Sequence, residues 1–412
     1  MPVEGQLGEK RASLESLHAM ALRGRSLPSA FVDVDAFDHN LARLLLPASL
    51  HGKQVRLATK SLRCPALIER AVQHSAGLIR GLMTFTARET LLWAERGAAD
   101  LLLGYPPGGL QDAQWLVQAN RRTRAAVIVD APQHVTWLAS AARTAQVKIP
   151  VWLDLDMGWR PVAGTHIGVR RSPLRTPDDV VALARTIAEE PFLELAGLMG
   201  YEAHVAGLPD DGRLASWQNP LKRWIKERSW PDIVVRRGEA VQALRTAGLV
   251  AGNWSCNGGG SGSVDRTAQD PSVTEITIGS GLLVGHLFDG YRGLDLQPAL
   301  HFALAITRIP TPGIVTCGGG GWIASGSAGA DRLPIPVWPV GCTLLPVEGA
   351  GEVQTPVRLP EGIAAEIGDA ILFRPAKSGE LAEIFSEYAF FSNGAFGAHV
   401  ATYRGLGWSA WG

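Results

Sequence analysis

The chain has 412 residues, of which 46% are hydrophobic and 19% are charged, and its 39 Lys and Arg residues balance its 39 Asp and Glu residues. A formal net charge of zero gives no basic excess of the kind that binds nucleic acid or an anionic membrane, so neither partner is expected. We see no apolar run of about 18 residues, no secretory leader and no paired cysteine spacing, so we expect a cytoplasmic protein without a membrane-spanning helix.

The first elements of the chain precede any regular alternation. We expect a helical segment over residues 1–28. The run Ala30–Asp35 alternates apolar and charged residues, as a half-buried strand does. This strand, over residues 29–36, is not one of the eight strands counted for the barrel below. We therefore expect it to join a sheet formed by the C-terminal part of the chain.

Between about residues 54 and 280, short apolar runs alternate with helical patterns such as Ala66–His74, Ala87–Arg96 and Arg237–Ala247. This alternation indicates parallel strands joined by crossover helices. Eight units over roughly 225 residues are typical of a closed (β/α)8 TIM barrel, so the expected fold class is α/β. A doubly wound open sheet is the alternative, although it more often has about six strands. The expected strands are Val55–Thr59, Leu78–Met83, Asp100–Gly104, Ala125–Asp130, Pro150–Asp154, Leu195–Gly200, Asn253–Cys256 and Thr274–Ile278.

Helical periodicity fades after about residue 290, and glycine, proline and short strand-like runs replace it. We therefore expect a barrel over residues 37–290 followed by a mostly β domain over residues 291–412. The expected C-terminal strands are Ala303–Ile309, Gly313–Cys317, Val353–Arg358 and Ala370–Phe373.

A glycine run follows the seventh expected barrel strand and predicts an anion site. Closely spaced glycines let the backbone approach a ligand and turn its N–H groups toward a negative charge. In barrel enzymes, phosphate often binds after strands seven and eight. Gly279 and Ser280 follow the eighth strand. A flexible surface loop is the alternative for the run alone. Its residues are Asn257, Gly258, Gly259, Gly260, Ser261, Gly262 and Ser263.

Other chemically capable side chains follow the ends of barrel strands, where such enzymes place their sites. Lys60 ends the first strand, and an amine held there could attack a carbonyl. The alternative is a lysine that extends into solvent. Arg160 follows the fifth strand and could face a ring nitrogen or a carboxylate, or pair with Asp154 or Asp156. Tyr201 and His204 follow the sixth strand as candidates for stacking or proton transfer, or as a structural network.

One cofactor accounts for these features together. Pyridoxal 5′-phosphate needs a lysine for its aldehyde, a cup for its phosphate and a partner for its ring nitrogen. With these residues in view, the chain resembles the fold-type III pyridoxal phosphate enzymes, the alanine racemase N-terminal superfamily. Within it the chain is similar to the D-threonine aldolase and D-serine dehydratase group, in the amino acid deaminase/aldolase branch. Matching segments include LATKSLRCPALIERA, LMGYEAHVAG, NGGGSGSV, VTEITIGSGL and TYRG.

The resemblance implies roles for the candidate residues. Lys60 would be the Schiff-base lysine, Arg160 would face the pyridine nitrogen, and Tyr201 would lie against the cofactor. The run 257–263 would hold the phosphate, helped by Gly279 and Ser280. The resemblance also implies a homodimer, in which the β domain of one chain closes the site of the other.

One departure concerns a metal. The aldolase and dehydratase relatives carry a divalent metal on a His-x-Asp or His-x-Cys pair near the C-terminus. Here His399 is followed two residues later by Ala401, which cannot ligate. A divalent metal stays possible, with its ligands unknown. The run Arg374–Glu380 is a further candidate for substrate contacts.

We therefore expect a pyridoxal phosphate-dependent lyase that acts on a β-hydroxy amino acid of D configuration, by retro-aldol cleavage or by dehydration. Lys60, His204 or Tyr403 would shuttle the proton. An amino acid racemase, with Lys60 and Tyr403 as opposed bases, is the alternative enzyme. A non-catalytic pyridoxal phosphate-binding protein and a barrel for some other phosphate are the remaining alternatives.

Overall fold

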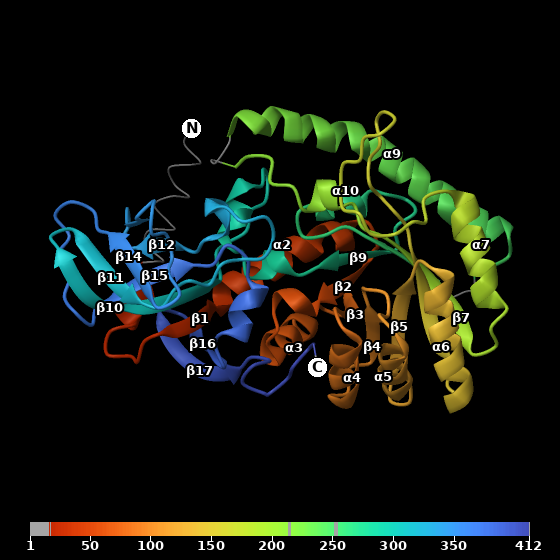
Figure 1. Cartoon of the computed structure of the whole chain (residues 1–412), viewed down its shortest axis with the longest axis horizontal. Coiled ribbons are helices and arrows are strands. Elements are labelled where there is room, and N and C mark those ends of the chain that lie inside the picture. Colours follow the sequence, from red (N-terminus) through yellow and green to blue (C-terminus); the bar gives the residue numbers. More distant parts are fainter. Residues whose placement is uncertain (1–15, 17, 213–215, 251–253, 412) are drawn as a thin grey trace.

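The computed structural model describes residues 16, 18–212, 216–250 and 254–411. Most of the expected helical segment 1–28 therefore lies outside the described residues. The described chain forms a closed barrel of eight parallel strands and a separate nine-stranded sheet. The expected α/β fold class, a TIM barrel followed by a mostly β domain, is confirmed. In Figure 1 the barrel lies to the right and the second sheet to the left.

The eight barrel strands occur where the alternation predicted them. Strand β2 pairs with both β3 and β9, and this pairing closes the barrel. Most residues of these strands are buried, because helices cover the outside and side chains fill the inside. The strands are β2 (Gln54–Ala58), β3 (Ile79–Thr84), β4 (Asp100–Leu103), β5 (Arg124–Val129), β6 (Ile149–Asp154), β7 (Leu193–Gly200), β8 (Ser255–Gly258) and β9 (Glu275–Ile278).

Local start signals place the helices between these strands. Helix α7, for example, begins with a capping box at Thr176 and a proline in its first turn. The α-helices are α2 (Val34–Leu50), α3 (Pro65–Gln73), α4 (Ala87–Glu95), α5 (Leu110–Asn120), α6 (Pro132–Ala145), α7 (Pro177–Ala188), α8 (Ala203–Ala206), α9 (Asn219–Thr246) and α10 (Val264–Ala268). Short 3₁₀ turns are η1 (Thr59–Ser61), η2 (Ser216–Gln218), η3 (Ser280–Leu282), η4 (His286–Gly290), η5 (Ala330–Arg332) and η6 (Gly379–Glu383).

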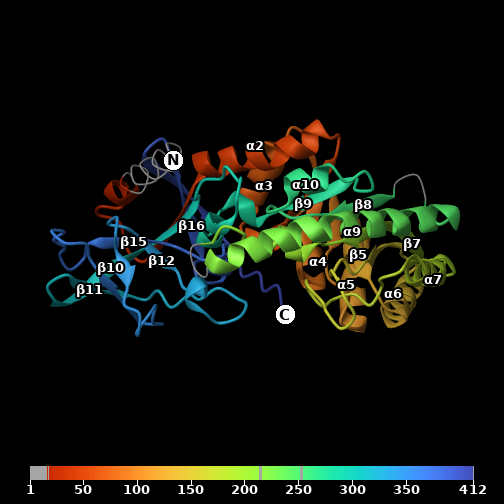
Figure 2. The same ribbon diagram turned by 90° about the horizontal axis from the view of Figure 1, so that it is seen from above.

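Helix α9 differs most from the expectation, which covered only its C-terminal part from Arg237. It is 28 residues long and contains Pro231. It runs along one side of the barrel toward the second sheet, as both views show (Figures 1 and 2). A proline and a weak apolar periodicity both argue against a helix in a sequence pattern. Packing against α7 is one of the tertiary contacts that support it. No helix within the described ranges is long and apolar enough to cross a membrane.

The second sheet combines the early strand with the C-terminal strands. β1 pairs antiparallel with β10 and parallel with β16. Phe31, at the centre of β1, is fully buried there against Phe391 and Phe396. The strands are β1 (Ser29–Asp33), β10 (Leu300–Thr311), β11 (Ile314–Gly318), β12 (Ile335–Trp338), β13 (Thr343–Leu344), β14 (Gln354–Arg358), β15 (Ala370–Arg374), β16 (Glu387–Ser392) and β17 (Ala395–Ala401). The sequence patterns did not predict β12, β13, β16 and β17.

After β17 the chain returns to the barrel. The backbone N–H of Tyr403 donates to the carbonyl of Arg63 at 2.8 Å, and the Thr86 hydroxyl donates to the carbonyl of Ala410 at 2.5 Å. Trp408 packs edge-on against Trp93 of α4, with ring centroids 5.7 Å apart. The C-terminal segment therefore fastens the second domain to the barrel on the side of α3 and α4.

Candidate active site

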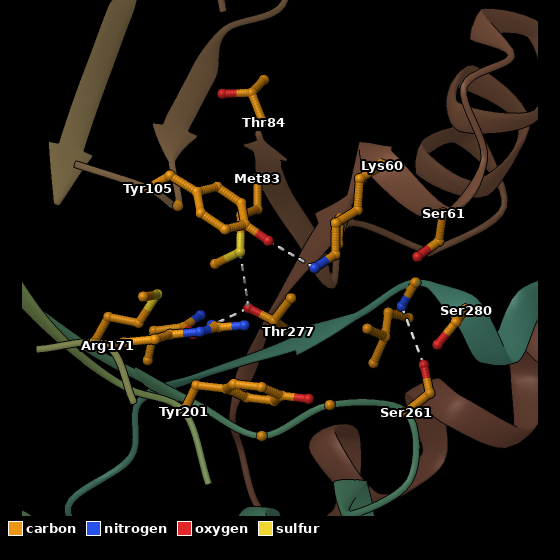
Figure 3. Close-up of a pocket in the computed structure, with 18 residues that line it drawn as sticks. Lys60, Ser61, Met83, Thr84, Tyr105, Arg171, Tyr201, Ser261, Thr277 and Ser280 are labelled. Carbon is orange, nitrogen blue, oxygen red and sulfur yellow. Dashed lines mark hydrogen bonds between the residues drawn. The ribbon is translucent and has the colours of Figure 1, made fainter. Parts of the chain in front are cut away.

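A pocket opens at the C-terminal ends of the barrel strands, with about 660 Å³ of empty volume when the open solvent at its mouth is included. Residues from the ends of β2, β3, β4, β7, β8 and β9 line it. The pocket therefore lies at the end of the barrel that carries the active site in TIM-barrel enzymes. Figure 3 shows the side chains that face it.

Lys60 reaches the pocket from η1, the turn that directly follows β2. Its ammonium Nζ donates to the hydroxyl of Tyr105 at 2.8 Å, and Tyr105 comes two residues after β4 ends. Figure 3 shows the lysine and the phenol pointing toward each other. A hydrogen bond therefore holds the amine against the pocket wall, while the residue as a whole is exposed.

The second domain packs against the turn that carries Lys60. The Ser378 hydroxyl donates to the carbonyl of Ser61 at 2.9 Å. A Cβ at Gly379 would lie only 2.1 Å from the carbonyl oxygen of Lys60, so no larger residue fits there. Next to these residues, Lys377 donates to the carbonyl of Ser325 at 2.7 Å. Burial lowers the pKa of Lys377, and the Lys60 charge is among the further causes. Ser378 and Gly379 of the run Arg374–Glu380 thus pack against the backbone of the turn that carries Lys60, while no residue of the run lines the pocket.

Two glycine loops meet on the opposite side of the pocket and form what we call the anion cup, residues 259–261 and 279–281. The Ser261 hydroxyl accepts the N–H groups of Gly279 and Gly281, both at 3.1 Å, and so joins the loops. Among the described residues, the backbone N–H groups of Ser261 and Ser280 have no acceptor. A Cβ at Gly281 would lie 2.7 Å from the Cβ of Ser261, so glycine is required there. Unpartnered N–H groups at a close-packed glycine turn suit an anion such as phosphate.

A buried ion network lies behind the anion cup. The Glu202 carboxylate accepts from Arg237 at 2.8 Å, from the N–H of Gly259 at 3.0 Å and from the Thr267 hydroxyl at 2.7 Å. Arg237 also donates to Asp270 at 2.5 Å. The Glu202, Arg237 and Asp270 side chains have 0% exposure. Glu202 is therefore a structural residue that fixes the glycine loop from behind.

Tyr201 forms the floor of the pocket. Its ring lies flat in Figure 3, below Lys60 and beside the anion cup. The guanidinium of Arg171 lies over this ring, 5.3 Å from its centroid. Burial raises the pKa of Tyr201 to about 12, so its phenol is neutral at pH 7. Asn257 and Thr277 complete the base of the pocket and are joined by a hydrogen bond of 3.0 Å. A flat aromatic floor of this kind can stack against a planar ligand.

Arg160, expected to face a ring nitrogen, does not line the pocket. It pairs with Asp156 at 2.8 Å and its side chain is 45% exposed, which is the ion pair given above as its alternative. Arg171 occupies the pocket instead. The loop after β6 folds back through a bridge between Trp159 and Ile167, and this turn carries the later arginine to the strand ends.

A buried acid lies close to Arg171. Asp154, at the end of β6, is 5% exposed. Burial and the neighbouring Asp130 raise the pKa of Asp154 to about 7, and the Arg171 charge opposes this shift. Near neutral pH, Asp154 is therefore a carboxyl that can hold or release a proton beside the pocket.

The two other expected proton carriers also lie outside the pocket lining. His204 is 5% exposed and packs beside Gly168, and burial lowers its pKa to about 4, so it is neutral at pH 7. Tyr403 is fully buried under the C-terminal segment. Its hydroxyl donates to Glu89 at 2.6 Å and accepts from Trp93 at 2.7 Å. Because both rings are packed into protein, neither reaches the pocket.

Only some residues of the glycine run 257–263 face the pocket. Asn257, Gly259, Gly260 and Ser261 line the pocket, together with Gly279 and Ser280. Gly258 ends β8 against Arg237, while Gly262 and Ser263 face a separate cavity behind the loop. Alternate residues of a tight turn point in different directions, so one run cannot present all its members to a single ligand.

His399 stands where the resemblance places the metal-binding pair of the relatives. His399 contacts Glu387 through Nδ1 at 2.6 Å and Arg25 through Nε2 at 2.7 Å, on β17 and away from the pocket. In the part of the chain that the structure describes, no group of three or more His, Cys, Asp or Glu side chains is placed to hold a metal ion.

Tyr105 and Arg171 are among the pocket residues that the sequence reasoning missed. Tyr105 carried the same signal that selected Lys60, because it follows the end of an expected barrel strand. Arg171 carried no such signal. It lies 17 residues beyond the end of β6 in an irregular loop, and only the fold of that loop brings it back.

Comparison with known proteins agrees with this architecture. Residues 32–228 match the family model described as alanine racemase, N-terminal domain. The search of curated protein sequences gave no match. Among solved structures, D-threonine aldolase from Filomicrobium marinum has 19% identity and a TM-score of 0.77, covering 92% of this chain and 95% of that chain.

Two further solved structures share the fold. D-threo-3-hydroxyaspartate dehydratase from Delftia sp. HT23 has 17% identity and a TM-score of 0.72, covering 92% of this chain and 98% of that chain. An alanine racemase from Clostridium difficile 630, in complex with cycloserine, has 12% identity and a TM-score of 0.64, covering 92% and 99%. The expected resemblance to the alanine racemase N-terminal superfamily is confirmed.

Proposed function

Residues 32–228 match the family model described as alanine racemase, N-terminal domain, and from this match we propose that the chain is a pyridoxal phosphate-dependent lyase of β-hydroxy amino acids. The reaction would be retro-aldol cleavage or dehydration, and the D configuration is the expected one. The similar solved structures of a D-threonine aldolase and a D-threo-3-hydroxyaspartate dehydratase support this class.

One observation carries the proposal: a lysine amine, a flat aromatic floor and an anion cup line a single pocket. These parts are Lys60, Tyr201 and the loops at residues 259–261 and 279–281. They meet three physical needs of pyridoxal phosphate, which are an amine for its aldehyde, a surface for its ring and N–H donors for its phosphate. Arg160, the expected partner of the ring nitrogen, is not among them. The unpartnered N–H groups of Ser261 and Ser280 are the specific sign of fit.

The roles of this chain's residues follow from that fit. When bound, pyridoxal phosphate withdraws electrons from the bonds at the amino acid Cα. Lys60 would hold the aldehyde and, as a free amine, would carry a proton to or from Cα. Tyr201 would support the ring. Arg171 would supply the fixed charge assigned to Arg160 from the sequence, and would face a ring substituent or the substrate carboxylate.

The positions of the candidate second bases favour a lyase over the racemase alternative. Racemisation by proton transfer needs two bases on opposite faces of Cα. Tyr403, the expected second base, is buried with its hydroxyl bound to Glu89 and Trp93. Tyr201 lies across the pocket from Lys60, but burial raises its pKa to about 12, so the phenol keeps its proton at neutral pH and is not available as a base. Neither of these two tyrosines therefore supplies the second base in the described chain.

The test is incubation of the purified protein and pyridoxal phosphate with D-threonine, D-serine and their L forms. We expect aldehyde and glycine, or ammonia and keto acid, from a D substrate. Lys60→Ala should abolish product and also the absorbance near 420 nm typical of pyridoxal phosphate bound to a lysine, whereas Lys148→Ala, an exposed lysine elsewhere, should change neither. Absence of product from every β-hydroxy amino acid would defeat the lyase proposal, and chiral chromatography of a single enantiomer would detect a racemase.

Three finer points remain proposals. A homodimer is expected from the resemblance, and sedimentation of the purified protein tests it. A divalent metal is tested by elemental analysis of the protein as purified and by the effect of EDTA on turnover. A cytoplasmic location is tested by fractionation of the source cells. A non-catalytic pyridoxal phosphate-binding protein would give the absorbance near 420 nm but no turnover.

A further inference from the structure

Tyr105 is placed beside the reacting end of Lys60. It follows β4 and is half-buried in the pocket wall. Its hydroxyl accepts a hydrogen bond from Lys60 Nζ at 2.8 Å, and the same ammonium lies 5.5 Å from the centroid of its ring. The Arg171 guanidinium lies 5.9 Å from that ring. The phenol is therefore held between the two cationic side chains that line the pocket.

The direction of this hydrogen bond leaves the phenol with a proton to give. Because the Tyr105 oxygen accepts from Lys60, its own O–H is free to donate elsewhere. Within the described residues this O–H has no acceptor, while the ring borders the open pocket. A ligand hydroxyl in the pocket could therefore meet the Tyr105 oxygen while that oxygen stays in contact with Lys60.

The other tyrosine of the pocket lacks this arrangement. The Tyr201 hydroxyl lies near Gly207, 3.3 Å from where a Cβ there would be, and it makes no hydrogen bond to Lys60 within the described residues. Tyr403 and His204 lie outside the pocket lining. Tyr105 is thus the phenol that joins the lysine to the space where a substrate would lie.

We propose that Tyr105 is a catalytic residue that relays a proton between the β-hydroxyl of the substrate and the amine of Lys60. This inference rests on the proposed lyase function and deepens it. In this proposal the proton of the substrate hydroxyl is transferred by Tyr105, which follows the third barrel strand, β4.

The relay balances for retro-aldol cleavage. When Lys60 is a neutral amine, its hydrogen bond with Tyr105 reverses and the phenol donates to the amine. The β-hydroxyl proton then passes to the phenolic oxygen of Tyr105 while the phenolic proton passes to the free amine of Lys60. The Cα–Cβ bond breaks, its electron pair stays with Cα, and the β-carbon becomes an aldehyde. The Lys60 ammonium then gives its proton to Cα. For threonine the products are acetaldehyde and glycine, and both side chains return to their starting protonation states.

The test is Tyr105→Phe, which removes only the hydroxyl, studied as the enzyme reconstituted with pyridoxal phosphate. Relay of a proton by a positioned side chain is worth about 10²–10⁴-fold in rate. We expect kcat on the preferred β-hydroxy amino acid to fall about 100-fold or more. Tyr388→Phe is the matched control, because that phenol is fully buried in β16 and has no hydrogen-bond partner. It should keep the wild-type rate.

Two further readouts separate catalysis from a structural effect. Exchange of the Cα protons of glycine with D₂O needs Lys60 but no β-hydroxyl. Elimination of chloride from β-chloro-D-alanine needs no proton on the leaving group. In Tyr105→Phe, whichever of these the wild type performs should stay within about threefold, as should the absorbance near 420 nm. Retention of β-hydroxy cleavage overturns the proposal, and so does equal loss of all reactions.

Failure of the two proposals is distinguishable. A wild-type protein that binds pyridoxal phosphate but acts on no amino acid refutes the lyase function and the relay with it. A wild-type lyase whose Tyr105→Phe variant cleaves at the wild-type rate refutes the relay alone.

Discussion

Removal of the Glu202 carboxylate probes how the barrel supports its anion cup. In Glu202→Ala, three donors lose an acceptor at once: Arg237, which keeps its bond to Asp270, the N–H of Gly259 and the Thr267 hydroxyl. Because these side chains are fully buried, water cannot replace the lost partner. The Gly259 N–H belongs to the loop that would hold the phosphate, so stability and cofactor binding should change together.

The burial of the network sets the size of the effect. Breaking a buried ion pair by deleting one partner costs about 3–5 kcal/mol. That is a large part of the roughly 5–15 kcal/mol by which a typical domain is stable. For comparison, Glu69 and Arg96 pair at 2.6 Å with side chains that are 42% and 37% exposed. A pair of this kind contributes only about 0–1 kcal/mol. Glu69→Ala is therefore the matched control.

Thermal unfolding and titration with pyridoxal phosphate, followed by absorbance, measure both effects. We expect Glu202→Ala to unfold at a clearly lower temperature and to bind the cofactor about tenfold or more weakly, the equivalent of about 1.4 kcal/mol or more. Glu202→Gln, which keeps the shape, should fold better and still bind more weakly. If Glu202→Ala matches Glu69→Ala in both measurements, the network does not support the cup and the reasoning fails.

Three other changes test different parts of the molecule. Gly281→Ala should weaken pyridoxal phosphate binding because its Cβ would displace Ser261. Its control is Gly238→Ala in helix α9, where an added Cβ meets nothing within 4 Å. That variant should stabilise the protein by about 0.5–1 kcal/mol in thermal unfolding. Tyr388→Phe removes a buried hydroxyl without a partner and should raise the unfolding temperature; a lower temperature would contradict this. Burial raises the pKa of Glu89 to about 7, against about 4.3 in an unfolded chain, so the folded protein retains a proton that the unfolded chain releases. Stability should therefore fall as pH rises from about 4 to about 7, and Glu89→Gln should flatten that slope in unfolding measured across this range.

The barrel could be predicted from the sequence because its strands, and its helices other than most of α9, carry local sequence signals. Buried strands such as Val151–Leu153 need continuous apolar runs, and their crossover helices need caps and periodic apolar faces. The parallel order then places every strand end at one rim. Lys60, Tyr201, Asn257 and Gly279 all line one pocket for that reason.

The sequence pattern selected Arg160 for the pocket, but the structure places Arg171 there. Both lie in the loop after β6, and the nearer arginine seemed the natural candidate. The loop instead turns back at Trp159 and Ile167, Asp156 binds the nearer arginine, and the later one enters the pocket. Loop paths depend on contacts made after the barrel has formed, so adjacency in sequence does not choose between two such residues.

The sequence by itself determined the architecture, the lysine and the two glycine loops, because periodicity, strand-end position and glycine density are properties of short segments. Only the tertiary structure decided which side chains share the pocket with them. It buried Tyr403 against Glu89, packed His204 beside Gly168 and brought Tyr105 to Lys60. The physical reason is that burial and hydrogen bonding join residues tens or hundreds of positions apart, and no short stretch of sequence records those contacts.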